Sequence, residues 1–230
     1  MKTLIIIILI VFTGIFTFAQ NCTAFIPGNT ETQLKFSNMN AKGKVESYQM
    51  QQVIDISQQD DAQAFTILSI TYDAKNQDKI IQQDTMYFKC KGVEFIIDME
   101  QYMDPSQNQE QSEDVSINIS SSEISYPAHM QANQKLNDGF IKLEISTGPV
   151  VITNTTEISN REVEAHEEIT TPAGNFTCYR ISQDISNKTG FITIKFHTIE
   201  WITEDIGTIR SETYNKKGKL QSVKELVEIN

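Results

Sequence analysis

Apolar and polar side chains alternate along much of this chain. The runs at residues 115–120, 141–145 and 192–196 place an apolar residue at every second position, which is the period of a β-strand. After residue 196, Ile199 and Trp201 shift the phase of this alternation, as a β-bulge would. Turn-forming sequences separate the runs: Lys42-Gly43, Lys75-Asn76-Gln77-Asp78, Lys91-Gly92, Asn137-Asp138-Gly139, Gly148-Pro149, Asn187-Lys188-Thr189-Gly190 and Lys217-Gly218. The pattern predicts an all-β fold, an antiparallel meander of roughly ten short strands.

Several predicted strands are apolar on both faces. Adjacent apolar residues occur at 67–68, 80–81, 95–97 and 150–152. A sheet with one wet face alternates more strictly, so these strands are expected to be covered on both sides. Either a second sheet layer or a helical segment lying in a concave sheet would provide that cover.

One segment departs from the strand pattern. Met99, Tyr102 and Met103 have the spacing of one helical face. The sequence at 104–107, Asp-Pro-Ser-Gln, is typical of a helix start. One or two short helices are therefore predicted near residues 98–112, with an irregular loop as the alternative.

The N-terminus has the features of a secretory signal peptide. Lys2 precedes an apolar run at 4–18, and Ala19 offers a small residue for cleavage. A membrane anchor is the alternative, but the run is about fifteen residues long and a spanning helix needs about twenty. Lipidation at Cys22 is disfavoured because Asn21 precedes it where a small residue is required. We expect a signal peptide at 1–19 and export to the periplasm or the medium.

The remaining chain, 20–230, is expected to form a single β-rich domain without a transmembrane segment. The full chain has a net charge of −11, and removal of Lys2 with the signal peptide leaves −12. This acidic balance argues against nucleic acid as a partner and disfavours adsorption to anionic lipid surfaces. It is typical of a soluble exported protein.

Residue patterns of catalytic and metal sites are missing from the sequence. It has no nucleophile elbow, no P-loop and no dinucleotide-binding glycine motif. His129, His166 and His197 are far apart, and Thr170 stands where a second zinc-binding histidine would follow His166 by one helical turn. Cys178 lies within a predicted strand, where a structural role is expected. We expect a non-catalytic protein with no cofactor and no metal.

Two hairpins near the ends of the chain share one sequence pattern. Residues 40–47 read NAKGKVES and residues 215–222 read NKKGKLQS. In each, a glycine supplies the positive φ of the turn and lysines flank it. The match is either a duplicated hairpin or a pair of basic tips, or it reflects how common the Lys-Gly-Lys turn is.

The last third of the chain carries its most distinctive sequence. Residues 170–181 read TTPAGNFTCYRI, Glu200-Trp201 follows, and residues 206–212 read IGTIRSE. This order of a turn and strand, a tryptophan strand and a hairpin resembles a family of exported bacterial proteins known as a domain of unknown function, with the pilus-assembly-associated protein TapB as one namesake. The residues that carry the resemblance are Pro172, Gly174, Phe176, Cys178, Trp201 and Gly207.

The resemblance implies a sheet similar to that of the lipoprotein carriers LolA and LolB. Such a sheet is curved and antiparallel, forms an incompletely closed barrel and holds helical elements. The shared motif is structural, so it transfers no active-site residue. The chain departs from the family at the polar stretch 107–114, which is poor in apolar residues for a helical plug. It also departs at Asn133, where a glycine is expected in the turn.

Three cysteines remain after removal of the signal peptide, so one disulfide bond and one odd thiol are expected. If strands run over 33–39, 45–56, 64–73 and 79–90, alternate turns lie at opposite ends of the sheet. Cys22, before the first strand, and Cys90, at the end of the fourth, then share one end. We expect a Cys22–Cys90 disulfide and a buried, reduced Cys178.

Two functions fit these features. The first is a binding module that holds a lipid, an acyl chain or an apolar peptide in its concave sheet. The second is an assembly or interaction module of the cell envelope, which would use an outer face or edge of the sheet to bind a protein partner. The sequence identifies neither the ligand nor the partner.

Overall fold

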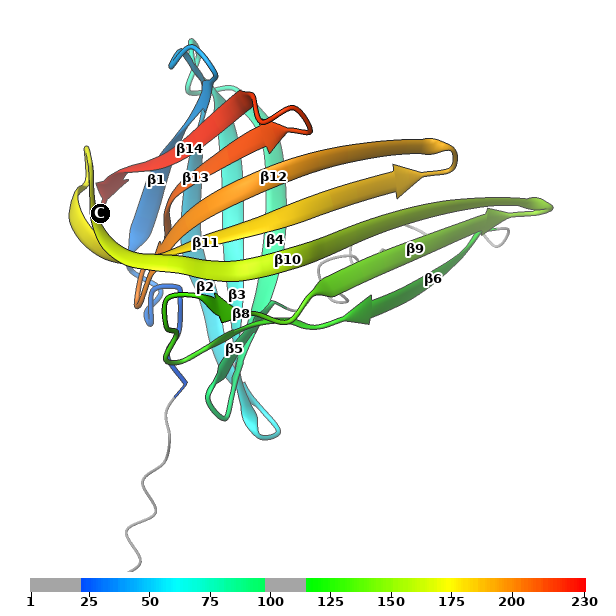
Figure 1. Ribbon diagram of the computed structural model, residues 1–230, viewed down its shortest axis with the longest axis horizontal. Helices are drawn as coiled ribbons and strands as arrows, with labels where there is room; N and C mark the ends of the chain where they lie inside the picture. The colour runs from blue at the N-terminus through cyan, green and yellow to red at the C-terminus, as the bar shows by residue number, and fades with distance from the viewer. Residues whose placement is uncertain (1–21, 98–114) are drawn as a thin grey trace, which may run out of the picture.

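The computed structural model describes residues 22–97 and 115–230 (Figure 1). These residues form fourteen β-strands in a single antiparallel sheet. The described ranges contain no helix, and so none with the length and apolar character needed to cross a membrane. The expected signal peptide at 1–19 and the helices expected near 98–112 lie outside these ranges.

The strands follow the alternating runs of the sequence. In chain order they are β1 (Gln33–Asn40), β2 (Val45–Gln59), β3 (Ala62–Asp73), β4 (Ile80–Lys91), β5 (Glu94–Ile97), β6 (Val115–Ser122), β7 (Ile124–Pro127), β8 (Gln134–Lys135), β9 (Gly139–Thr147), β10 (Val150–Thr171), β11 (Gly174–Thr189), β12 (Ile192–Thr203), β13 (Gly207–Asn215) and β14 (Leu220–Ile229).

The sheet curls into a barrel that is almost closed. Its strand order is β6-β9-β10-β11-β12-β13-β14-β1-β2-β3-β4-β5-β7, with β8 paired to β10 outside this path. The first and last strands of the path, β6 and β7, follow each other in the chain, and one seam between the two ends of the sheet is unsealed. The outer parts of β6, β9, β10, β11 and β12 project beyond the barrel as a wing (Figure 1). The predicted fold, an incompletely closed antiparallel barrel, is confirmed.

The main apolar core lies inside the barrel. Residues that share a face of their strands meet there, and Val163 and Ile181 are fully buried. A second cluster forms around Phe36, Ile209 and Leu226, each of which is at most 1% exposed. Period-two alternation produces both clusters because it directs every second side chain to the same side of the sheet.

The expectation that four strands are covered on both sides is correct at one place, correct in part at a second and wrong at two. Phe95 and Ile96, neighbours on opposite faces of β5, are both buried, whereas at the second place Ile67 is buried and Leu68 is half-buried. Ile80 and Ile81 are about half exposed, because they begin β4 beside a turn, where the register with β3 shifts. The residues at 150–152 are 53–59% exposed, because they lie at the tip of the wing (Figure 1).

The bulge expected near Ile199 lies instead between Trp201 and Ile202, on the edge of β12 that pairs with β13. The register of β11 with β12 is continuous from Thr189 to Tyr179. The shift occurs between Trp201 and Ile202, in the pairing of β12 with β13. Ile199 and Trp201 therefore lie on the opposite face of β12 from Ile194 and Phe196, and no bulge separates the two pairs.

Candidate functional site

The barrel interior holds a cavity of about 320 Å³. Its wall is mainly aromatic and aliphatic and includes Phe88, Phe95, Tyr126, Ile185 and Ile202. These side chains come from five different strands and line one space because each sits on the inner side of its strand. The size and apolar wall of the cavity are those of a site for a small molecule or a single chain.

An N-terminal segment closes one end of this cavity. Phe25 and Ile26, which precede β1, are buried and line the cavity. The ring of Phe25 lies 5.9 Å from that of Phe95 and 5.8 Å from that of Tyr126, measured between centroids. A Cβ atom on Gly207 would lie 2.4 Å from the carbonyl oxygen of Phe25. Gly207 is thus required for the close approach of this segment, and its φ of +99° also favours glycine.

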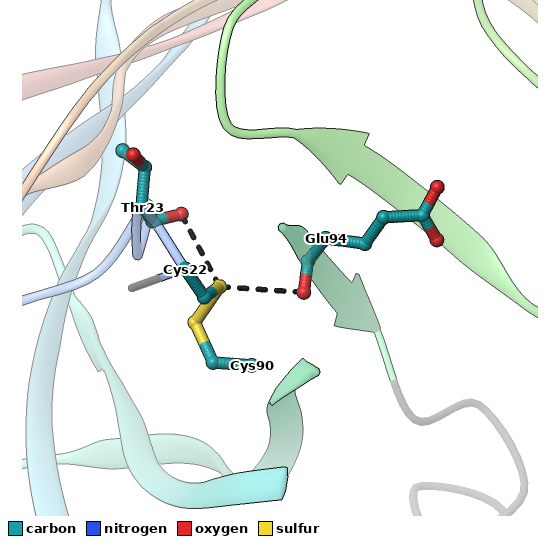
Figure 2. The surroundings of a disulfide bond; sticks show 4 residues. All are labelled: Cys22, Thr23, Cys90 and Glu94. Carbon is teal, nitrogen blue, oxygen red and sulfur yellow. Dashed lines mark hydrogen bonds between the residues drawn. A yellow bond between two sulfur atoms is a disulfide. The ribbon is translucent and has the colours of Figure 1, made fainter. Parts of the chain in front are cut away.

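A disulfide bond attaches the same segment to the sheet. Cys22 and Cys90 are joined, with their Cα atoms 5.5 Å apart, and this is the pair expected from the order of the strands. The sulfur of Cys22 lies 3.3 Å from the carbonyl oxygen of Glu94 (Figure 2). The bond holds the N-terminal segment under the barrel through a covalent link to the end of β4.

Two charged side chains, from strands on either side of β13, line the mainly apolar cavity. Glu200 on β12 and Lys224 on β14 are both half-buried, and both pair with Ser211 on the strand between them. Burial raises the pKa of the Glu200 carboxyl. Burial lowers the pKa of the Lys224 ammonium to about 8, although the charge of Glu200 partly opposes this effect. The Lys224 nitrogen lies 4.2 Å from the centroid of the Phe36 ring.

A buried arginine joins strands near the seam. Arg161 is 1% exposed, and its Nη1 donates hydrogen bonds to the carbonyl oxygens of Ser125 and Asn137, at 3.2 and 2.7 Å. Its Nε donates to the side-chain oxygen of Gln183 at 3.3 Å, and its guanidinium lies over the ring of Tyr126. Arg161 therefore connects β7, the loop before β9, and β11, where the sheet is interrupted.

The family-motif residues lie mainly outside the cavity. Pro172 and Gly174 form the turn between β10 and β11. Phe176 and Trp201 pack against the second apolar cluster, to which the fully buried Cys178 belongs. Of the six motif residues, Gly207 lines the cavity.

The side chains around this cluster also fit a structural role. The indole nitrogen of Trp201 donates a hydrogen bond to a carboxylate oxygen of Glu167 at 2.8 Å. Burial raises the pKa of the Cys178 thiol to about 12, which keeps it protonated. Asn133, which stands where the resemblance leads us to expect a glycine, has a φ of +66°.

The three histidines lie on separate elements. His166 stacks on Tyr179 with centroids 4.5 Å apart, and His197 Nδ1 lies 2.9 Å from a carboxylate oxygen of Asp184. His129 lies between β7 and β8. Across 22–97 and 115–230, no three His, Cys, Asp or Glu side chains are grouped so as to hold a metal ion.

Sequence reasoning missed three charged side chains: Glu200 and Lys224, which line the cavity, and Arg161, which is buried near the seam. Glu200 is an even number of residues from Ile194 and Phe196, so the alternation of β12 places all three on one face of the strand. This indication was present in the sequence. Lys224 could have been noticed as a charge on an inner-facing position of β14. Arg161 lies at a shift in the register of β10 with β11, directly after Asn160, whose φ is positive. The sequence gives no sign of this shift.

Known structures share this fold. The chain superposes on a predicted exported protein with a YmcC-like fold from Bacteroides fragilis with a TM-score of 0.69 and 24% identity, covering 91% of this chain and 100% of the other. It superposes on a predicted lipoprotein from Parabacteroides distasonis with a TM-score of 0.71 and 24% identity, covering 92% and 100%. Among curated proteins, none matches the sequence. The DUF3108-like family matches residues 30–226, so the chain belongs to the DUF3108-like family.

Proposed function

We propose that this protein is a non-catalytic exported protein that binds one lipid or apolar peptide chain inside its barrel. The observation that carries this proposal is the cavity of about 320 Å³ with its apolar wall. An apolar chain that enters it leaves water for a preformed surface, which is the main source of affinity in such sites. The resemblance to the LolA and LolB carriers supports the same function, and the names of the two similar structures fit an exported location.

The two charges in the cavity indicate how such a ligand would be oriented. Lys224 lies in the wall with no ion-pair partner within 4 Å in the described part of the chain. An acidic head group could pair with this ammonium while the apolar chain contacts Phe88 and Ile185. An amphiphile with a single acyl chain and a carboxylate is therefore the ligand class that fits best.

Native mass spectrometry of the protein purified from the periplasm tests this function. We expect a co-purifying molecule of defined mass, and we expect the stripped protein to bind palmitate. Ile185→Trp should reduce palmitate binding because the larger side chain fills the cavity, whereas Ser186→Trp, one residue along β11 and directed to the other face, should not. A protein that carries nothing and binds neither palmitate nor hexadecanol would refute the proposal.

The second function, an interaction module of the cell envelope, is favoured by the tip of the wing. Phe191 is fully exposed, and Ile192 and Ile194 are 67% and 51% exposed. The exposed residues at 150–152 belong to the neighbouring hairpin, since the amide of Gly190 donates a hydrogen bond to the carbonyl of Thr153 at 3.2 Å. Two adjacent apolar hairpin tips are typical of a protein-binding surface.

A photo-crosslinking residue at position 191 tests this second function in cells. We expect one discrete crosslinked envelope protein from this position and none from the same residue at position 58, which is exposed on β2. If both positions give the same products, or neither gives any, the wing tip is not a docking surface.

A further inference from the structure

Three turns at one end of the barrel concentrate positive charge. The turns at 41–44, 74–79 and 216–219 contain seven lysines and a single carboxylate, Asp78. The chain as a whole has 30 acidic and 19 basic side chains. The charge is therefore segregated, with a basic end on a strongly acidic molecule. We refer to these three turns as the basic end.

Strand pairing places the three turns side by side. The β1–β2 and β13–β14 hairpins are neighbours because β14 pairs with β1, where Asn40 lies opposite Ser222. The β3–β4 turn adjoins the first hairpin, since the amide of Ala74 donates a hydrogen bond to the carbonyl of Glu46 at 3.4 Å. Figure 1 shows the three loops together at one end of the barrel.

The two Lys-Gly-Lys hairpins have the same local geometry. The side-chain oxygen of Asn40 accepts hydrogen bonds from the amides of Lys42 and Lys44, at 3.0 and 3.2 Å. The side-chain oxygen of Asn215 accepts them from Lys217 and Lys219, at 2.9 and 3.1 Å. The asparagines hold both turns in one shape, and the lysines are thereby fixed on the outermost residues of each tip.

All the lysines of the basic end are exposed. Their ammonium groups make no ion pair with any residue in the described ranges, unlike Lys35, Lys91, Lys135 and Lys142. Asp73, beside the third turn, uses its carboxylate to accept hydrogen bonds from two backbone amides of that turn. The positive charge of the tips is therefore available to a partner.

Apolar residues adjoin these lysines. Ile80 and Ile81 directly follow Lys79 and are 51% and 52% exposed. Lysines next to exposed aliphatic side chains are typical of segments that lie on a membrane, where the ammonium groups meet lipid phosphates and the aliphatic groups enter the interface. An acidic protein surface would use the lysines but would leave the two isoleucines in water.

We propose that the basic end docks on a bilayer surface that contains anionic phospholipid. The net charge of −11 opposes adsorption of the molecule in other orientations, so it favours this one. The proposal concerns a surface distinct from the cavity and does not depend on the function proposed for it. Each lysine near an anionic surface is expected to strengthen binding about five-fold.

Vesicle co-sedimentation of the protein purified from the periplasm tests this proposal. We expect binding to vesicles of phosphatidylcholine mixed with phosphatidylglycerol, little binding to phosphatidylcholine alone, and weakening as salt is added. The test variant replaces five lysines of the two hairpin tips by glutamine: Lys42, Lys44, Lys216, Lys217 and Lys219. It should bind at least about 100-fold more weakly.

A control variant changes the net charge equally. It replaces five lysines outside the basic end by glutamine: Lys91, Lys135, Lys142, Lys188 and Lys195. This variant should bind as the parent does, and Ile80→Asn should weaken binding in the parent. Three outcomes would each overturn the proposal. The parent binds both kinds of vesicle equally, the two lysine variants lose vesicle affinity equally, or the parent binds no vesicles. Palmitate binding by the test variant should stay unchanged, and this expectation separates the result from the test of the cavity.

Discussion

Replacing Lys224 by methionine should stabilise the empty protein. The substitution shortens the unbranched side chain by one atom and removes its charge from the cavity wall. Burial lowers the pKa of Lys224 from 10.5 to about 8. At about 1.4 kcal/mol for each pKa unit, this difference corresponds to about 3 kcal/mol against the charged form in the folded state. Loss of the contact between the ammonium and the Phe36 ring removes about 1 kcal/mol, so a net gain of about 2 kcal/mol is expected at pH 7.

The gain should depend on pH in a defined direction. Below pH 8 the lysine is protonated in both states, and the full cost of its burial is present. Between pH 8 and 10.5 the unfolded chain binds more protons than the folded one, so the parent becomes more stable as pH rises. The difference between Lys224→Met and the parent should therefore be largest at pH 7 and shrink towards pH 10.5.

Guanidinium unfolding followed by the fluorescence of Trp201, the single tryptophan, measures this difference. Both proteins should carry Cys178→Ala, so that a free thiol cannot attack the disulfide at high pH. Lys219→Met, at an exposed tip, is the matched control and should change the free energy of unfolding by less than about 0.5 kcal/mol. A parent as stable as Lys224→Met at pH 7, or a difference that does not change with pH, would refute the reasoning.

Three further variants test what holds the barrel together. Cys22→Ser with Cys90→Ser opens a loop with a sequence separation of 68 and should cost about 4 kcal/mol in guanidinium unfolding. Gly207→Ala should cost about 3 kcal/mol or more in the same assay, because its Cβ clashes with backbone, whereas Gly28→Ala meets nothing within 4 Å and should be neutral. Arg161→Met leaves buried carbonyl oxygens unpaired and should lower stability by about 3 kcal/mol; an unchanged melting temperature would show that the seam does not need it.

The strands were predictable because their limits are set locally. Residues 33–39 and 79–90 were expected as strands, and β1 and β4 span Gln33–Asn40 and Ile80–Lys91. Gly43 and Gly218, both with positive φ, end their strands through turns that the sequence marks clearly. The pairing of neighbouring strands follows from such turns, since a short turn joins antiparallel strands.

The interior of the barrel was less predictable, because it depends on how the sheet curls. Apolar residues at 150–152 resemble those at 95–97 in sequence, yet the first are exposed at the tip of the wing, whereas Phe95 and Ile97 line the cavity and Ile96 is buried on the other face. Glu200 stands between Ile199 and Trp201, and the apparent change of phase concealed that it faces inward. The burial of a side chain on β12 depends on which strand lies opposite it across the barrel. That strand is distant in the sequence, so the local pattern does not reveal it.

The cost of Lys224 and its proposed role can be separated in one variant. A lysine in an apolar wall destabilises the empty barrel, because its ammonium loses water without gaining an ion-pair partner among the residues that the structure describes. A bound carboxylate would supply that partner. Its ion pair with Lys224 would be stronger inside the cavity than an ion pair at the protein surface. Lys224→Met should therefore raise the free energy of unfolding while weakening palmitate binding by about tenfold or more, and it should leave hexadecanol binding almost unchanged. If palmitate and hexadecanol binding fall together, the lysine shapes the cavity and does not select an acidic head group.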